Sequence, residues 1–333
     1  MNNSRITIRP AQPADVPALI AIKGPGSEAV HLDRLRDAQT PDTQYLVVLD
    51  DMEVVGFASL IFRRPAHWSD AADTTRLPQI VDLQVAESRR GQGLGSVFIR
   101  ALEGMAASRD CKELYLAVDP LDNPRAYALY LRLGYQPLQT EPYRAEWHFT
   151  DSAGIYHHGE EWTIDMLKPI GAAQALYDPR RLDALRRIVE RLETPTLPAL
   201  NWALTGSTAL ALQGVDVVAH DIDLQTNAED AYRAEERLRE FVVTPVREVI
   251  SQHMRSHLGK LEMHGIQVEI MGDIQKRAAD GSWDELPRLE QHRQWVVFEG
   301  LRLPVLALEY EYRAYLQMGR LEKAEQIRRR LER

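Results

Sequence analysis

The stretch RRGQGLGS, residues Arg89–Ser96, decides the fold of the first half of the chain. It follows the apolar run Ile80–Val85 and leads into Gly95–Ala107, where apolar residues recur at helical spacing. Glycines let the backbone come close to a ligand, and the start of a helix offers free N–H groups and the positive end of its dipole. The stretch therefore predicts a strand, a loop and a helix that together cradle a pyrophosphate.

The spacing of the glycines excludes two common types of phosphate-binding loop. Gly91, Gly93 and Gly95 alternate with other residues, whereas the dinucleotide-binding G-x-G-x-x-G pattern has its third glycine three positions after the second. The Lys-Ser/Thr pair of a P-loop is also missing. The remaining pattern is R-x-x-G-x-G/A, formed by Arg90, Gly93 and Gly95. It resembles motif A of the GNAT acetyltransferase superfamily, which holds the pyrophosphate of acetyl-CoA.

A second motif further along the chain supports this resemblance. Residues 123–135, NPRAYALYLRLGY, resemble the family's following pattern, N-x-x-A-x-x-L-Y-x-x-x-G-F/Y. Strand and helix signals also alternate in the order of the GNAT fold across about residues 5–168, which implies an α/β (α+β) domain around a central mixed sheet. These signals fall at Arg5–Pro10, Gln12–Ile22, Tyr45–Leu49, Val54–Phe62, Ile80–Val85, Gly95–Ala107, Glu113–Val118, Pro124–Leu133 and Trp162–Leu167.

The resemblance implies which residues bind the coenzyme and which take part in acetyl transfer. The backbone N–H of Val85 would bind the thioester carbonyl, and Asn123 would contact the coenzyme. Tyr130 would protonate the leaving thiolate, or it is a half-buried packing residue. Asp82 is either a base that acts through water or a solvated strand residue. The coenzyme-binding loop would comprise Arg90, Gly91, Gln92, Gly93, Leu94, Gly95 and Ser96.

The resemblance places the groove for the acetyl acceptor between two stretches, about Asp15–Arg36 and Glu141–Glu160. The second stretch is rich in aromatic residues and histidine. It could line an acceptor pocket, and a long β-hairpin with a wet tip is the alternative. His157 and His158 are interpreted as turn residues rather than as a pair of metal ligands.

The second half of the chain contains two carboxylates on a predicted strand, DIDL at residues 221–224. Alternate side chains of a strand share a face, so Asp221 and Asp223 project together. Carboxylates that close repel each other unless a cation lies between them, and oxygen ligands suit Mg²⁺. Glu269, on a second predicted strand, could supply a third carboxylate.

This arrangement resembles the polymerase-β-like nucleotidyltransferase superfamily over about residues 178–330. The resemblance implies that Gly206 and Ser207 hold a nucleoside triphosphate and that Asp221, Asp223 and Glu269 hold two metal ions. Asp273 competes with Glu269 for the third position. Many such proteins carry a basic residue just before the first aspartate, but residues 217–220 read VVAH. A degenerate domain that binds a nucleotide or a partner without catalysis is therefore the alternative to active transfer.

Three other features of the sequence have simpler interpretations. The segment Arg255–His257 could face the phosphates, and an exposed polar segment is the plainer interpretation. Cys111 is the sole cysteine, which excludes an intrachain disulfide and a cysteine-based metal site, and we interpret it as a half-buried filler. The further helices and strands of the second half are predicted at Pro179–Leu192, Ser207–Leu212, Asp221–Leu224, Asp230–Phe241, Lys260–Met263, Gln267–Met271 and within Ala307–Arg333.

Chain length and net charge limit the number of domains and the classes of function that the sequence allows. A chain of 333 residues suggests two domains, predicted as 1–168 and 179–333 with a linker at 169–178. The net charge of −9 and the acidic balance of both halves disfavour nucleic-acid binding. The sequence has no apolar run long enough to span a membrane and its N-terminus does not resemble a signal peptide, so we expect a cytoplasmic protein.

The function expected from the two resemblances is acetyl-CoA-dependent N-acetylation of an amine on a small molecule or a protein. The second domain is expected to be a Mg²⁺-dependent nucleotidyltransferase that uses a nucleoside triphosphate. One hypothesis is that both domains act on the same acceptor, such as an aminoglycoside-like or polyamine compound. The alternative is an acetyltransferase whose second domain is a non-catalytic nucleotide- or partner-binding module, as in toxin–antitoxin pairs. GNAT proteins often dimerise, so a homodimer is compatible with the resemblance.

Overall fold

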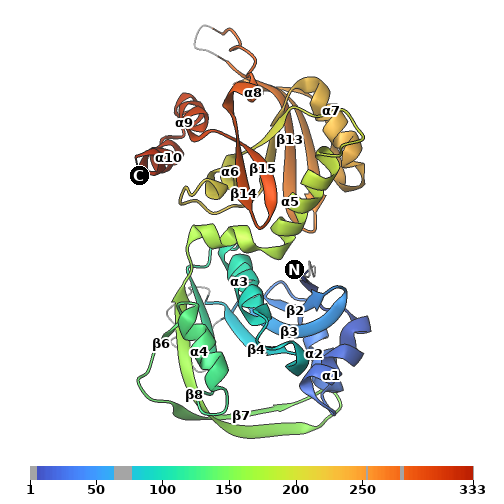
Figure 1. Ribbon diagram of the computed structural model, residues 1–333, viewed down its shortest axis with the longest axis vertical. Coiled ribbons are helices and arrows are strands. Elements are labelled where there is room, and N and C mark those ends of the chain that lie inside the picture. The colour runs from blue at the N-terminus through green and yellow to red at the C-terminus, as the bar shows by residue number, and fades with distance from the viewer. Residues whose placement is uncertain (1–5, 64–76, 253, 278–280, 333) are drawn as a thin grey trace. The chain divides into compact units, whose positions relative to one another are not determined.

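The computed structural model describes residues 6–63, 77–252, 254–277 and 281–332. The chain divides into two compact units, Met1–Pro179 and Arg180–Arg333. Each unit is a mixed α/β structure built on its own sheet (Figure 1). Within the described ranges, none of the helices combines the length and the apolar character that crossing a bilayer requires.

The first unit contains the GNAT-like order of elements. Its elements are β1 Ile6–Pro10, η1 Pro13–Asp15, α1 Val16–Lys23, α2 Glu28–Asp37, β2 Thr43–Asp50, β3 Glu53–Ile61, β4 Gln79–Val85, η2 Glu87–Arg89, α3 Leu94–Ala107, β5 Glu113–Val118, α4 Pro124–Arg132, β6 Gln136–Pro137, β7 Tyr143–Thr150, β8 Tyr156–Pro169 and η3 Ala172–Tyr177.

The sheet of the first unit opens between β4 and β5. Its strand order is β1-β2-β3-β4-β5-β8-β6. β4 and β5 are parallel neighbours, but they pair only at Gln79–Tyr115 and Ile80–Leu116. Beyond Ile80, β4 continues to pair with β3, while β5 pairs with β8. The two strands therefore diverge, and the backbone of β4 from Val81 onward has an edge that can bind a ligand.

A long antiparallel hairpin extends from the far side of this opening. β7 and β8 pair from Tyr143–Thr163 to Thr150–Tyr156, and Figure 1 shows them as a two-stranded arm along the foot of the unit. The backbone N–H of Ser152, at the hairpin tip, donates to Asp33 of α2 at 2.9 Å. The hairpin thus joins the β8 side of the opening to the α1–α2 side.

The stretch predicted as a linker, residues 169–178, has regular structure. It contains η3, and η3 packs on α3 with Ala175 and Leu176 buried. Gly104 of α3 makes this packing possible, because a Cβ there would overlap the backbone at Tyr177 and Asp178. This segment therefore belongs to the first unit.

The second unit begins with the helix that the sequence predicts at Pro179–Leu192. Its elements are α5 Pro179–Leu192, β9 Trp202–Thr205, α6 Gly206–Leu212, β10 Ile222–Thr226, α7 Ala228–Arg237, η4 Arg239–Phe241, β11 Val242–Ile250, β12 Met254–Met263, β13 Ile266–Lys276, α8 Leu289–His292, β14 Arg293–Phe298, β15 Leu301–Leu306, α9 Leu308–Gln317 and α10 Leu321–Leu331.

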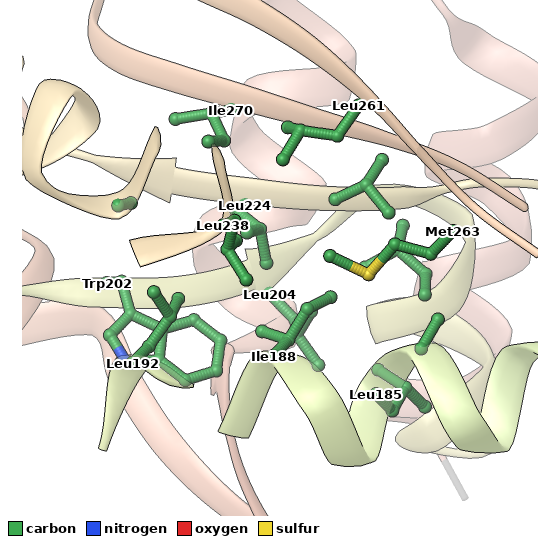
Figure 2. Packing of buried hydrophobic residues seen from close by; sticks show 14 of the residues in the cluster. Leu185, Ile188, Leu192, Trp202, Leu204, Leu224, Leu238, Leu261, Met263 and Ile270 are labelled. Atoms are coloured by element: carbon green, nitrogen blue, oxygen red, sulfur yellow. The ribbon is translucent and has the colours of Figure 1, made fainter. Parts of the chain in front are cut away.

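One face of the second sheet holds the hydrophobic core. The strand order is β11-β12-β13-β10-β9-β15-β14. Figure 2 shows side chains of α5 lying beside those of the strands in this core. The labelled residues are Leu185, Ile188, Leu192, Trp202, Leu204, Leu224, Leu238, Leu261, Met263 and Ile270. Because strand side chains alternate, Asp223 and Glu269, next in sequence to Leu224 and Ile270, point to the opposite face.

Several predicted elements differ from the observed ones. The helix expected from Gln12 is a short 3-10 turn followed by α1, and the helix expected to reach Phe241 ends at Arg237. The strand expected at Trp162–Leu167 is the longer β8, because its first half pairs with β7 rather than with the central sheet. The C-terminal segment forms two helices that meet near Gly319, whose φ is +69°.

Candidate functional sites

The glycine loop of the first unit leads directly into α3, as the sequence predicts. Gly91 and Gly93 have φ values of +79° and +84°, which side chains disfavour, and Gly93 is the N-cap residue of α3. A Cβ at either glycine would meet no atom within 4 Å, so the space above the loop is open. The first N–H groups of a helix have no partner within the helix. Gln92, Leu94, Gly95 and Ser96 complete this loop and first turn.

Arg90 ties the loop to the end of β4. Its Nε donates to the carbonyl oxygen of Val85 at 3.0 Å. Val85 pairs with Gly56 of β3 and lies beyond the last contact of β4 with β5. The Val85 backbone and the glycine loop are therefore adjacent, as a coenzyme that spans both would require.

Tyr130 lies on α4, whose N-cap residue is Asn123. Its side chain is 8% exposed and packs edge-on against Tyr135, with ring centroids 5.9 Å apart. Burial raises the pKa of Tyr130 to about 12, so the phenol stays protonated at neutral pH. Asn123 is exposed and its side chain does not cap the helix, which leaves it available to a ligand.

Asp82 lies in a bulge of β4, where its φ is +51°. Its Oδ2 lies 2.6 Å from Nζ of Lys23 on α1 and 2.5 Å from Nη1 of Arg34 on α2. Burial opposes ionisation, but these two cations lower the pKa of Asp82 below its usual range. A carboxylate held this way is a poor proton acceptor, so the geometry favours a counter-ion over the predicted base.

The residues around this ion cluster are aromatic. The Arg34 guanidinium lies over the rings of Tyr45 and Phe57, 5.8 and 6.0 Å from their centroids. Nδ1 of the buried His31 is 2.7 Å from the Tyr45 hydroxyl, and burial lowers the pKa of His31 to about 4. His31 is therefore neutral at pH 7, and the charges of this region are those of Lys23, Arg34 and Asp82.

The aromatic stretch of the predicted acceptor groove forms the β7–β8 hairpin. Trp147 lies over Gly159, and Phe149 stacks on His157 with ring centroids 4.7 Å apart. Nε2 of His157 contacts Asp151 at 2.8 Å, whereas His158 stacks on Tyr156 on the other face of the hairpin. The two histidines thus point to opposite faces and do not form a ligand pair. Both lie within β8 rather than in the turn, so their interpretation as turn residues is wrong.

In the second unit, four polar side chains form a row across the sheet. Strand register places Asp223 between Thr205 of β9 and Glu269 of β13, and Glu269 beside Lys260 of β12. Lys260 pairs with Glu269 at 2.9 Å. Asp273 lies beyond the end of the β10–β13 pairing, so Glu269 is the strand carboxylate that neighbours Asp223.

The surroundings of Asp223 disfavour the charged form of its carboxyl group. Burial, followed by the charges of Asp221 and Glu269, raises its pKa to about 8. Glu311 of α9 contributes to the same shift, and burial raises the pKa of Glu311 itself to about 7. Negative charge is thus concentrated where the sequence predicts a cation.

Gly206 and Ser207 lie against these carboxylates. Gly206 has a φ of +68°, and a Cβ there would overlap the Asp223 carboxylate, so the site requires glycine. Ser207 Oγ donates to Oδ1 of Asp221 at 2.9 Å. The predicted phosphate-binding residues therefore contact the predicted metal ligands.

Sequence reasoning missed the contribution of α9 and of the turn after it. Thr205 Oγ1 donates to Glu311, and the backbone N–H of Gly206 also donates to that carboxylate. Tyr315, one turn further along α9, is buried, and Arg320 follows with its backbone N–H bonded to the Tyr315 carbonyl oxygen at 2.9 Å. Arg320 is exposed, and its charge opposes the rise in the pKa of Asp223. Arg320 thus supplies a positive charge near Asp223. The segment just before Asp221, VVAH at residues 217–220, contains no lysine or arginine that could do so.

A buried arginine holds the segment before Asp221. Arg181 of α5 is 1% exposed, and its Nη2 donates to the carbonyl oxygens of Ala219 and His220 at 2.5 and 3.1 Å. The only sequence signal was a charged residue on the apolar face of a predicted helix.

Other residues singled out from the sequence lie away from these sites. Arg255 pairs with Glu248, and His257 contacts Tyr232 on α7, which packs on the core face of the sheet. Cys111 is buried.

The carboxylate oxygens of Asp221, Asp223 and Glu269 are suitable ligands for a divalent cation, but the three side chains do not converge on one point. In the described part of the chain, no three His, Cys, Asp or Glu side chains converge in a metal-binding group. Asp221 and Asp223 are oxygen donors whose mutual repulsion a cation would relieve. Glu269 is engaged by Lys260 and would have to turn from it.

Comparison with known families matches both units. Residues 17–135 match the acetyltransferase (GNAT) family, and residues 184–330 match the aminoglycoside-2''-adenylyltransferase family. The chain joins a GNAT acetyltransferase domain to a nucleotidyltransferase-like domain. Both resemblances inferred from the sequence are confirmed, and so is the mixed α/β fold class. No curated protein matches the chain.

Solved structures resemble each domain separately. A candidate nucleotidyltransferase from Thermotoga maritima is 47% identical, with a TM-score of 0.41, and the match covers 46% of this chain and 94% of that one. The Escherichia coli ribosomal-protein-S18-alanine N-acetyltransferase is 21% identical, with a TM-score of 0.35 and coverage of 50% and 94%. A phosphinothricin acetyltransferase from Sinorhizobium meliloti, solved with acetyl-CoA, is 20% identical, with a TM-score of 0.36 and coverage of 50% and 89%.

Proposed function

We propose that the chain is an acetyl-CoA-dependent N-acetyltransferase whose second domain binds a nucleoside triphosphate with Mg²⁺. One observation supports the first activity above all. The glycine loop, Arg90 and Val85 lie together where β4 diverges from β5. This is the arrangement that a bound thioester and its pyrophosphate need in this family.

The proposed transfer needs little from the protein beyond positioning and one proton donor. The neutral amine nitrogen attacks the thioester carbon, whose oxygen accepts a hydrogen bond from the Val85 N–H. The C–N bond forms, the C–S bond breaks, and the proton of the amine leaves to water. Tyr130 then gives its phenolic proton to the coenzyme thiolate, and the resulting phenolate regains a proton from water before the next turnover. Asp82, held ionised by Lys23 and Arg34, orients the α1–α2 side of the opening instead of removing the proton.

In the second domain, Gly206 and Ser207 would hold the triphosphate, and Arg320 would face its negative charge. Asp221 and Asp223 would hold Mg²⁺, with Glu269 as a third ligand once it leaves Lys260. When bound, Mg²⁺ neutralises phosphate charge and orients the reacting phosphoryl group. The chain's own task is to keep the carboxylates close together, which the Thr205–Asp223–Glu269 row does.

The acceptor of the second reaction would be a hydroxyl-bearing molecule, since the family matched by the second domain is named for transfer of an adenylyl group to an aminoglycoside. A specific observation favours a second candidate, a non-catalytic nucleotide-binding module. Lys260 neutralises Glu269, the third carboxylate that two-metal transfer would use.

Product analysis tests the proposal. Purified chain is incubated with acetyl-CoA and a panel of amines, and free thiol and acetylated product are measured. The same panel with Mg²⁺ and each nucleoside triphosphate is examined for pyrophosphate. Acetylated product without pyrophosphate would support the non-catalytic second domain. Absence of acetylated product from every amine and protein acceptor would contradict the acetyltransferase proposal.

A further inference from the structure

The acceptor side of the acetyltransferase opening has opposite charges on its two flanks. On the β4 flank, Lys23, Arg34 and Asp82 form one cluster in which two cations share one carboxylate. On the β5 flank, Asp119 follows β5 directly and Glu161 lies on β8 just beyond the residues paired with β5. One flank thus carries an excess positive charge, and the other carries carboxylates.

The cation cluster is partly open to solvent. The side chains of Lys23, Arg34 and Asp82 are 25%, 19% and 16% exposed. Three elements bring them together, since Lys23 ends α1, Arg34 lies on α2 and Asp82 occupies the bulge of β4. Asp82 lies three residues before Val85, whose N–H would bind the thioester. A molecule that reaches the thioester from this side therefore meets both cations.

The carboxylate flank suits an ammonium group. The Glu161 side chain is exposed, and partial desolvation followed by the negative charge of Asp119 raises its pKa. Among the ion pairs of the described residues, neither carboxylate has a cationic partner. Asp119 accepts backbone N–H groups of Leu121 and Asp122, which fixes its position.

We propose that the acetyl acceptor is a small zwitterion, an amine that also carries a carboxylate or a comparable anion. Its anionic group binds Lys23 and Arg34, and its ammonium group approaches Asp119 and Glu161 before losing a proton. This assignment rests on the proposed acetyltransferase function and narrows its substrate class. A polycation such as an aminoglycoside or a polyamine lacks the anion that the β4 flank would bind.

Matched acceptors test the proposal. Each amino acid in a panel is compared with its amide, which keeps the amine and loses the anion, and with the corresponding decarboxylated amine. A charge-assisted hydrogen bond contributes roughly tenfold to a hundredfold in binding. We expect kcat/KM for the preferred amino acid to exceed that for its amide by at least about tenfold, mainly through KM.

Variants assign this preference to the cluster. Lys23→Gln and Arg34→Gln should each reduce the acid-over-amide ratio of kcat/KM about tenfold, and Lys23→Arg, which keeps the charge, should keep the ratio of the unaltered chain. Asp82→Asn should raise the ratio, because it removes the internal carboxylate that competes for both cations. Arg132→Gln, an exposed charge removal on α4, is the matched control and should leave the ratio unchanged.

The outcomes separate this inference from the function on which it rests. If no amine of any class is acetylated, the proposed function fails. If amines are acetylated but amides or polyamines are preferred, or if the variants lower kcat for acid and amide alike, the zwitterion assignment is overturned. A loss of folding in any variant is detected by its melting temperature, and the comparison of acid, amide and decarboxylated amine on the unaltered chain then carries the test.

Discussion

At the scale of single residues, the phenol of Tyr130 has the protonation state that its proposed role needs. Burial raises its pKa to about 12, so the phenol holds its proton throughout the neutral range until a thiolate forms beside it. Replacing it with phenylalanine removes the donor and keeps the packing against Tyr135. We predict that Tyr130→Phe lowers kcat by roughly a hundredfold or more, with KM for acetyl-CoA nearly unchanged. Steady-state kinetics measure both constants. A rise in KM with unchanged kcat would make Tyr130 a packing residue.

Gly206 is the residue at which the second site tolerates least change. Its left-handed backbone costs a side chain about 1–2 kcal/mol, and a Cβ would also overlap the Asp223 carboxylate. We predict that Gly206→Ala abolishes nucleotide binding in calorimetry and lowers the melting temperature. Gly300→Ala is the control, because that glycine has a similar φ of +77° and no atom near its Cβ position. Equal effects of the two substitutions would show that backbone strain, rather than the overlap with Asp223, is the cause.

Asp223 makes stability depend on pH in a defined direction. Burial and the neighbouring carboxylates raise its pKa to about 8 in the folded chain, whereas an unfolded aspartate has a pKa of about 4. Between these values the unfolded state loses its proton first, so the free energy of unfolding falls as pH rises from about 4 to about 8. Asp223→Asn removes this dependence.

Melting temperatures in chelator across pH 5–8.5 test the effect. We predict that Asp223→Asn melts higher than wild type at pH 8, by roughly 2–8 °C, and that the gap closes at pH 5. The matched control Asp216→Asn, at an exposed position of the same domain, should follow wild type. Added Mg²⁺ should raise the wild-type melting temperature at pH 8 but not that of Asp223→Asn. Parallel curves for wild type and Asp223→Asn would contradict this account of the site.

At the scale of elements, the contact between α3 and η3 depends on one glycine. Glycine to alanine in a helix ordinarily stabilises by about 1 kcal/mol. At Gly104 we expect the same substitution to destabilise the protein, because the added methyl group would overlap the backbone at Tyr177 and Asp178. Overpacking of this kind costs about 1–3 kcal/mol. We predict that Gly104→Ala lowers the melting temperature. Gly95→Ala, where the neighbour is the movable Leu129 side chain at 3.3 Å, should not.

Elements with strong local patterns could be predicted from the sequence. The β2–β3 hairpin, α3 and α5 were predicted within two residues at each end because periodicity and turn residues mark them locally. The strands β9, β14 and β15 were missed. β9 is only four residues long, whereas β14 and β15 form a hairpin about the two-residue turn Glu299–Gly300, a local signal that the sequence reasoning overlooked. The linker prediction relied on small residues in Gly171–Ala175 and could not reveal their packing on α3.

The residues of the candidate sites also differ in whether the sequence alone could predict them. Motif residues such as Arg90, Gly206 and Asp223 are recognisable because the backbone conformation or the charge pattern is local. Lys23, Arg34 and Glu311 are not, since each acts on a residue far away in sequence. Arg34 lies on an ordinary charged helix, and only the bulge of β4 brings it to Asp82.

At the scale of the whole molecule, we propose two separate ligand-binding sites in one chain. The first is built on the divergence of β4 and β5, and the second on a row of carboxylates across a different sheet. The residues proposed for each site all come from a single unit. Substitutions at one site should therefore leave ligand binding at the other intact.

A sequential calorimetric titration tests this central claim most directly. Acetyl-CoA is titrated into the chain to saturation, and then ATP, GTP, CTP or UTP is titrated in with Mg²⁺. We predict one acetyl-CoA and one nucleotide bound per chain, with micromolar affinity for at least one nucleotide and loss of that second binding event alone in Asp221→Asn. Absence of acetyl-CoA binding, or of binding by every nucleotide, would contradict the assignment of two working sites.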